Sequence, residues 1–111
     1  MNKLIKNYTV DTRYPGVSGI EHLQMLRTRS RLAEIEDTLT ADERRLLAEA
    51  DQRLIDRVAE FWAELSRFVD LAEERRRLQS PPEHWWWYLD VLAQVPALVP
   101  ARETKRELVP A

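Results

Sequence analysis

The 111-residue chain contains no cysteine, which excludes disulfide bonds, thiolate catalysis and cysteine-ligated zinc or iron–sulfur sites. It has only two glycines, Gly16 and Gly19, so everything after residue 19 is free of glycine. A glycine-rich phosphate loop or dinucleotide fingerprint cannot be built from two glycines. Stability must therefore come from side-chain packing, and the glycine-free segment permits long helices.

The chain also lacks a strong net charge and a long apolar run. Its 17 basic and 19 acidic residues give a formal net charge of −2, which provides no overall field to attract nucleic acid or an anionic membrane. It has no apolar run of about 18 residues, and the N-terminal stretch MNKLIKNYTV lacks the apolar core of a signal peptide. We therefore expect a soluble cytoplasmic protein with no membrane segment, and we do not expect nucleic acid as its main partner.

Before the C-terminal segment at 96–111, three stretches carry a helix-start signal, in which a Ser or Thr is followed three residues later by Glu. They begin at Ser18, Thr40 and Ser80. The third is reinforced by Pro81, because a proline is favoured at the first helical position, where its missing N–H costs nothing. Pro96 is expected to end the helix that follows. The sequence therefore predicts three helices, at about 19–38, 41–78 and 81–94.

The predicted central helix is unusually long, about 57 Å at a rise of about 1.5 Å per residue. It contains no proline or glycine at which to break. Its apolar residues form three rows with a spacing of seven: Leu47, Leu54, Phe61 and Phe68; Val58, Leu65 and Ala72; Ile55, Trp62 and Val69. On a helical wheel these rows cover about 100°, which is wider than the seam of a two-stranded coiled coil.

A stripe of this width needs more than one neighbouring helix to cover it. The helices at 19–38 and 81–94 could each run back along part of the central helix, leaving one flank of the stripe exposed. We therefore predict an all-α fold of three helices, an antiparallel helical hairpin or bundle with coiled-coil character, completed by formation of a homodimer.

The two ends of the chain are predicted to lie outside the helical domain of residues 18–95. Residues 1–17 are predicted to form an N-terminal arm that holds a short β-like run, KLIKNYTV, and a type II turn at Tyr14-Pro15-Gly16. Residues 96–111 contain three prolines and mixed charge, and we expect a flexible C-terminal tail there. Either end could become ordered against a partner.

The two histidines, His22 and His84, are not joined by an HxxxH or ExxH spacing, so the sequence predicts neither a metal nor another cofactor. The run Arg75-Arg76-Arg77 follows two glutamates and is interpreted as a solvated helix end in which Glu73 pairs with Arg77. The remaining basic clusters would instead form the surface of a nucleic-acid-binding or antitoxin-like regulator, and they consist of Arg27, Arg29, Arg31, Arg44 and Arg45.

Six residues separate Arg77 from His84 in the stretch RLQSPPEH. This spacing resembles the RX4-6H motif of the HEPN ribonucleases, which are small all-α proteins that act as dimers. The resemblance implies cleavage of RNA across a dimer cleft, with His84 in acid–base chemistry and Arg77 holding the phosphate. The sequence departs from the usual pattern at Leu78, where a polar residue is common, and at Pro81-Pro82. The alternative interpretation is that His84 is a surface or packing residue.

Three adjacent tryptophans, Trp85, Trp86 and Trp87, follow the predicted start of the third helix. On a helical wheel Trp85 falls within the apolar face, Trp87 at its margin and Trp86 among polar residues. Trp85 is therefore predicted to be buried and Trp86 to be exposed. Because an exposed indole on a helix is typical of a protein contact, Trp86, Trp87 and Tyr88 are the predicted partner-binding residues.

Together these patterns favour a non-enzymatic module for protein interaction or oligomerisation, which is a small scaffold or adaptor. It would form a homodimer and contact a further protein through Trp86 or the chain termini. We do not expect an enzyme, and the HEPN-like ribonuclease is the alternative. The nucleic-acid-binding or antitoxin-like regulator is the second alternative.

Overall fold

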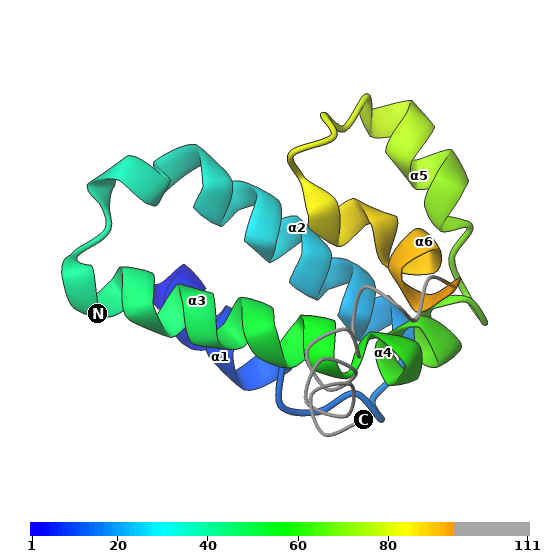
Figure 1. The fold of residues 1–111 in the computed structure, drawn as a ribbon, viewed down its shortest axis with the longest axis horizontal. Coiled ribbons are helices and arrows are strands. Elements are labelled where there is room, and N and C mark those ends of the chain that lie inside the picture. Colours follow the sequence, from blue (N-terminus) through cyan, green and yellow to red (C-terminus); the bar gives the residue numbers. More distant parts are fainter. Residues whose placement is uncertain (95–111) are drawn as a thin grey trace, which may run out of the picture.

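The computed structural model describes residues 1–94, which form helices joined by short turns (Figure 1). The α-helices are α1 (Lys3–Asp11), α2 (Gly19–Ile35), α3 (Ala41–Asp56), α4 (Val58–Leu65), α5 (Leu71–Leu78) and α6 (Leu89–Gln94), and the short 3-10 helices are η1 (Glu36–Thr38) and η2 (Trp85–Tyr88). Strands are absent from residues 1–94, so the predicted all-α class is confirmed. In the same residues no helix is long and apolar enough to cross a membrane. The predicted tail at 96–111 and the helix stop at Pro96 lie outside the described residues.

The first predicted helix and the predicted start of the second are confirmed. The Ser18 hydroxyl caps α2 by accepting the Glu21 N–H at 3.4 Å, and η1 carries the helical path on to Thr38. At α3 the complete capping box is present. Thr40 Oγ1 accepts the Glu43 N–H at 3.1 Å, and the Glu43 carboxylate accepts the Thr40 N–H at 2.9 Å. Both starts depend only on hydrogen bonds between near neighbours, which is why a local pattern located them.

The predicted single helix at 41–78 is wrong, because this segment folds into α3, α4 and α5. The first break is at Arg57, which has φ −117° and ψ 30° although no proline or glycine is near. The second break is the turn after α4, and α5 then begins at Asp70, whose Oδ1 accepts the Glu73 N–H at 3.1 Å. Aspartate caps helices as well as serine does, so Asp70 was a start signal that a search for Ser and Thr alone overlooked.

The breaks redistribute the apolar stripe of the central segment. Leu47, Leu54 and Phe61 are buried as the heptad row predicts, but Phe68 falls in the turn after α4 and is 56% exposed. The stripe is covered within one chain, because α1 packs on α3 and α2 packs on α4. It therefore does not need a second copy, although that need was the reason for predicting a homodimer. The homodimer stays a prediction.

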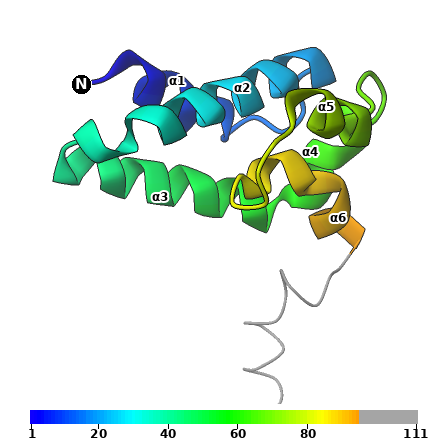
Figure 2. The same ribbon diagram turned by 90° about the horizontal axis from the view of Figure 1, so that it is seen from above.

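The N-terminal segment forms a helix and not the predicted β-like run. Ile5, Tyr8 and Thr12 are buried, and their spacing of three or four residues places them on one helical face. Asn2 caps α1 by accepting the Leu4 N–H at 2.7 Å, and its own N–H donates to Glu43 Oε2 at 2.8 Å. α1 thereby packs against both α2 and α3 and belongs to the common core (Figure 2).

The turn that leads from α1 to α2 forms where it was predicted, but it is not of type II. The Val17 N–H donates to the Tyr14 carbonyl at 3.4 Å across Pro15 and Gly16. A type II turn requires a positive φ at its third residue, and Gly16 does not have one.

A buried ion pair joins the first three helices. Arg29 of α2 donates Nε to Asp51 Oδ1 at 2.9 Å and Nη2 to Oδ2 at 3.1 Å, and Asp51 belongs to α3. The Tyr8 hydroxyl of α1 donates to the same carboxylate at 2.6 Å. Burial, followed by the charge of Asp51, raises the pKa of Tyr8 well above its usual value, so the hydroxyl keeps its proton.

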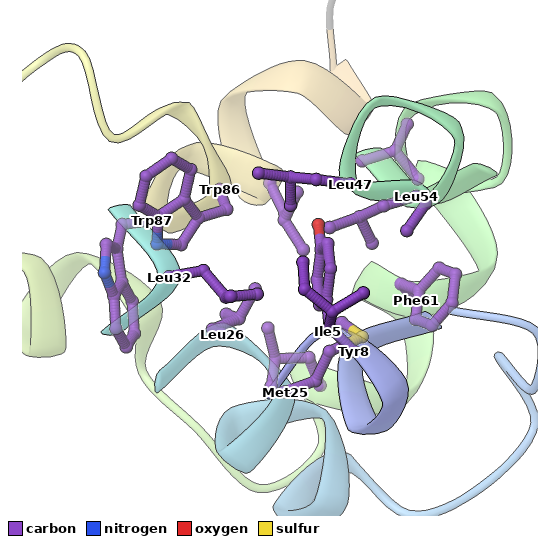
Figure 3. Close-up of a cluster of buried hydrophobic side chains, with 14 of the residues drawn as sticks. Ile5, Tyr8, Met25, Leu26, Leu32, Leu47, Leu54, Phe61, Trp86 and Trp87 are labelled. Carbon is purple, nitrogen blue, oxygen red and sulfur yellow. The ribbon is translucent and has the colours of Figure 1, made fainter. Parts of the chain in front are cut away.

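The guanidinium of Arg29 also lies 4.2 Å from the ring centroid of Trp86, and so extends the same network to η2. Figure 3 shows Tyr8 among the aliphatic side chains of the core, with Trp86 and Trp87 on one side and Phe61 on the other. Four elements therefore meet around one ion pair.

Gly19 marks a close approach between α2 and α4, since a Cβ added there would lie 2.5 Å from the Glu64 carbonyl oxygen and 2.9 Å from the Leu65 Cα. Both are backbone atoms, so we expect Gly19→Ala to lower the free energy of unfolding by about 1–3 kcal/mol. Gly16→Ala is the matched control, because a Cβ at Gly16 would meet nothing within 4 Å. Urea unfolding followed by circular dichroism measures both, and equal stability of the two variants would contradict the close approach.

The ion pair predicts a second pair of variants. We expect Asp51→Asn to lower the free energy of unfolding by about 3 kcal/mol, because it leaves the buried Arg29 charge without its carboxylate. Asp42→Asn is the control, since Asp42 pairs with Arg45 at 3.5 Å on the exposed face of α3. Loss of such an exposed pair costs about 0.5 kcal/mol. Denaturant unfolding compares them, and a loss no larger than that of the control would show that the buried pair does not hold the helices.

Candidate binding groove

The helix predicted at 81–94 begins later, at residue 85. α5 ends at Gln79 in the left-handed conformation (φ 54°), and the Ser80 N–H donates to the Arg75 carbonyl at 3.2 Å. The capping box predicted with Glu83 needs the same N–H, so it does not form. Residues 80–84 are a connection, and the helical path resumes with η2 at Trp85.

The tryptophans do not take the predicted positions. Trp86 and Trp87 are each 2% exposed, whereas Trp85 is half-buried. Both buried indoles donate their N–H groups to the Ser30 hydroxyl of α2, at 2.9 and 2.8 Å. The prediction that Trp86 is exposed is therefore wrong. The partner site predicted at Trp86, Trp87 and Tyr88 loses the exposed indole on which it was based.

A groove of about 350 Å³ lies between α2 and the segment that runs from the end of α5 into η2. These two segments face each other in Figure 1, where the segment after α5 is drawn in yellow. One wall consists of Arg27, Ser30, Arg31 and Glu34. The other wall consists of Leu78, Ser80, Pro81, His84 and Trp87. The volume lies within the range of about 300–1,000 Å³ that is typical of ligand pockets.

Two arginines that have no partner among residues 1–94 border the groove. Arg27 and Arg31 are exposed and one turn apart on α2. Within residues 1–94 neither of them forms a salt bridge or a side-chain hydrogen bond, and the single acidic residue of the lining is Glu34. Arginines elsewhere on the helices are paired, and examples are Arg45 with Asp42, Arg57 with Glu60 and Arg67 with Glu64. The groove therefore has an uncompensated positive charge.

His84 is held at the groove by an aromatic stack. Its ring lies 4.5 Å from the ring of Trp86, centroid to centroid, at an interplanar angle of 20°. Its backbone N–H donates to the Pro81 carbonyl at 3.0 Å and closes the turn before η2. No hydrogen bond from residues 1–94 reaches the imidazole nitrogens, so the ring can donate to or accept from a molecule in the groove.

The groove wall is attached to the rest of the molecule through Arg75. One guanidinium nitrogen of Arg75 donates to the Trp87 carbonyl at 2.8 Å and to Asp90 Oδ1 at 2.7 Å, and the guanidinium lies 4.5 Å from the Tyr88 ring centroid. Arg75 thus joins α5 to η2 and α6. The prediction of an entirely solvated run at residues 75–77 is wrong at this residue.

The other two arginines of that run remain on the solvated surface. Arg76 pairs with Glu73 and Arg77 pairs with Glu74, both with a spacing of three, in place of the predicted pair between Glu73 and Arg77. Arg77 does not line the groove, whereas His84 does. No contact within residues 1–94 brings Arg77 and His84 together, and the cleft between two copies that the HEPN resemblance implies stays a prediction.

The five arginines of the predicted nucleic-acid surface do not share one face. Arg29 is buried in its ion pair, Arg44 donates to the carbonyls of Asp37 and Leu39, and Arg45 pairs with acidic neighbours on α3. Arg27 and Arg31 are the members of this set that border the groove.

The first histidine has a structural role. His22 is buried, with Nε2 2.9 Å from the Pro15 carbonyl oxygen and its ring 4.7 Å from that of Phe61. Among residues 1–94, no three His, Asp or Glu side chains are placed to hold a metal ion together.

The shared acceptor of the two indoles can be tested by Ser30→Ala. This change leaves two buried N–H donors without an acceptor, and each such donor costs about 1–3 kcal/mol, so we expect a loss of about 2 kcal/mol or more. Ser66→Ala is the control, because the Ser66 hydroxyl is exposed and bonds only to the Ala63 carbonyl. Urea unfolding gives the stabilities, and tryptophan near-ultraviolet circular dichroism reports the indole environment. Two equally stable variants would contradict the assignment.

Comparison of the chain with protein-family models, with curated proteins and with solved structures finds no match. The geometry and charge of the groove are therefore the basis on which a function can be assigned.

Proposed function

We propose that this chain is a non-enzymatic helical binding module, a small scaffold or adaptor that holds a protein partner in the groove between α2 and η2. The observation that carries the proposal is that Arg27 and Arg31, which have no partner among residues 1–94, face a wall with apolar surface from Leu78 and Pro81. A positively charged rim beside an apolar base is typical of a surface that recognises a protein segment.

The polar side chains that line the groove are better suited to binding a partner than to catalysing a reaction. The Ser30 hydroxyl accepts two indole N–H groups, which occupy both of its lone pairs and make it a poor nucleophile. Arg27 and Arg31 present guanidinium N–H donors, which can hold an anion through hydrogen bonds but do not accept a hydrogen bond. His84 is stacked on Trp86. Among residues 1–94, no carboxylate forms a hydrogen bond that would orient the His84 ring.

The walls of the groove are formed before a partner arrives. The α2 wall is fixed to the core by Arg29, and the η2 wall is fixed to α2 by the indole hydrogen bonds to Ser30. Arg75 fixes the same wall to α5. A rigid site loses little conformational entropy on binding, and this increases the affinity that a given set of contacts provides.

The partner in this proposal is another protein and not a second copy of the chain. The wide stripe that suggested a homodimer is covered by α1 and α2, and the groove carries positive charge that a second identical groove would repel. Light scattering at high concentration provides a separate measurement of the oligomeric state.

The double variant Arg27→Ala/Arg31→Ala tests the groove. We expect immobilised wild-type chain to capture a partner from an extract of the cells that express it, and the double variant to capture at least about tenfold less, because two charge-assisted contacts are lost. Mass spectrometry quantifies the captured proteins.

The matched control is Arg76→Ala/Arg77→Ala, which removes the same charge from two exposed residues of α5 that do not line the groove. Circular dichroism checks that both variants are folded. Equal capture by the two double variants would show that the partner does not bind in the groove.

A further inference from the structure

We infer that the groove binds an extended peptide segment in which one apolar side chain lies between two acidic ones. This inference rests on the proposed function and specifies the chemistry of the partner. It follows from the spacing of the two arginines, from the wall that faces them and from the position of Glu34.

The spacing of the arginines matches two carboxylates on an extended chain. Residues four apart on a helix have Cβ atoms about 5–6 Å apart. Alternate side chains of an extended peptide lie on one side of it and are about 6.5–7 Å apart. A peptide segment running along α2 can therefore bind Arg27 through one carboxylate and Arg31 through a second. Each contact can take the bidentate geometry that guanidinium groups favour.

The side chain between the two acids points to the other side of such a segment, toward the facing wall. The apolar part of that wall is Leu78, which is 44% exposed, together with Pro81 and the buried ring of Trp87, and the same wall also holds Ser80 and His84. A leucine-sized or larger apolar side chain would cover the exposed part of Leu78. The groove thus presents charge on one wall and an apolar patch on the other, as the alternating peptide requires.

Glu34 limits how far acidic residues can extend along the bound peptide. It lies on α2 one turn beyond Arg31 and lines the same groove, without a salt bridge in residues 1–94. A third acid at that end of the peptide would face its carboxylate and be repelled. A nucleic acid carries a phosphate at every nucleotide and would continue past Glu34, whose carboxylate would repel it. A small free anion would leave the exposed part of Leu78 uncovered, so the observations favour a peptide.

Selection from a library of short random peptides on the full-length wild-type chain tests the inference. We expect the selected peptides to be enriched in an acidic–apolar–acidic triplet. Fluorescence anisotropy of the best labelled peptide should show affinity at least about tenfold weaker for Arg27→Ala/Arg31→Ala, and near wild-type affinity for Arg76→Ala/Arg77→Ala. Asparagine or glutamine in place of the two acids, or alanine in place of the apolar residue, should weaken binding to a similar extent.

The outcomes that overturn the inference can be distinguished from failure of the proposed function. Neutral or basic peptides whose binding is lost in Arg27→Ala/Arg31→Ala would refute the acidic segment and leave the groove as a protein-binding site. Displacement of the peptide by inorganic phosphate or by a single-stranded oligonucleotide, at concentrations below that of the peptide, would assign the groove to small anions or to nucleic acid. If no peptide is selected, the inference fails, and the capture experiment with the two double variants decides the proposed function separately.

Discussion

The ion pair between Arg29 and Asp51 is the contact on which the arrangement of the helices depends. It joins α2 to α3, receives the Tyr8 hydroxyl from α1 and supports the ring of Trp86 in η2. A buried charge is costly without its partner, so any packing that separated the two side chains would be disfavoured even if it buried the same apolar surface. The pair has its own cost, because Arg29 Nη1 is buried without a partner among residues 1–94. Its contribution is to select one placement of the helices.

The same turn of α2 serves both the core and the groove. Residues two apart on an α-helix point to nearly opposite sides, so Arg29 faces inward while Arg27 and Arg31 face outward. Ser30 lies between these directions and accepts both indoles. The network that positions Trp86 and Trp87 thereby also positions the second wall of the groove. The backbone of both walls is therefore held by contacts of the core.

Part of the candidate site could be predicted from the sequence. The alternation of Arg27, Arg29 and Arg31 around a helix was visible, and it separates one inward cation from two outward ones. The second wall could not be predicted, because it depends on where the chain resumes a helical path after Pro81-Pro82. At the end of α5 the Ser80 N–H bonds back to the Arg75 carbonyl and is not available to the predicted capping box. Which indoles are buried is set by contacts with α2, where Ser30 accepts from Trp86 and Trp87, and a wheel drawn for the segment alone does not contain these contacts.

The sequence by itself determined the all-α class and the helix starts at Ser18 and Thr40. Each of these depends on hydrogen bonds within one turn or on a periodicity within one helix, and a local pattern contains both. Only the tertiary structure decided the break at Arg57, the packing of α1 into the core and the burial of Trp86 and Trp87. No proline or glycine marks that break, and α4 beyond it packs on α2. The free energy that decides such features comes from contacts between residues far apart in the chain, which a local pattern does not contain.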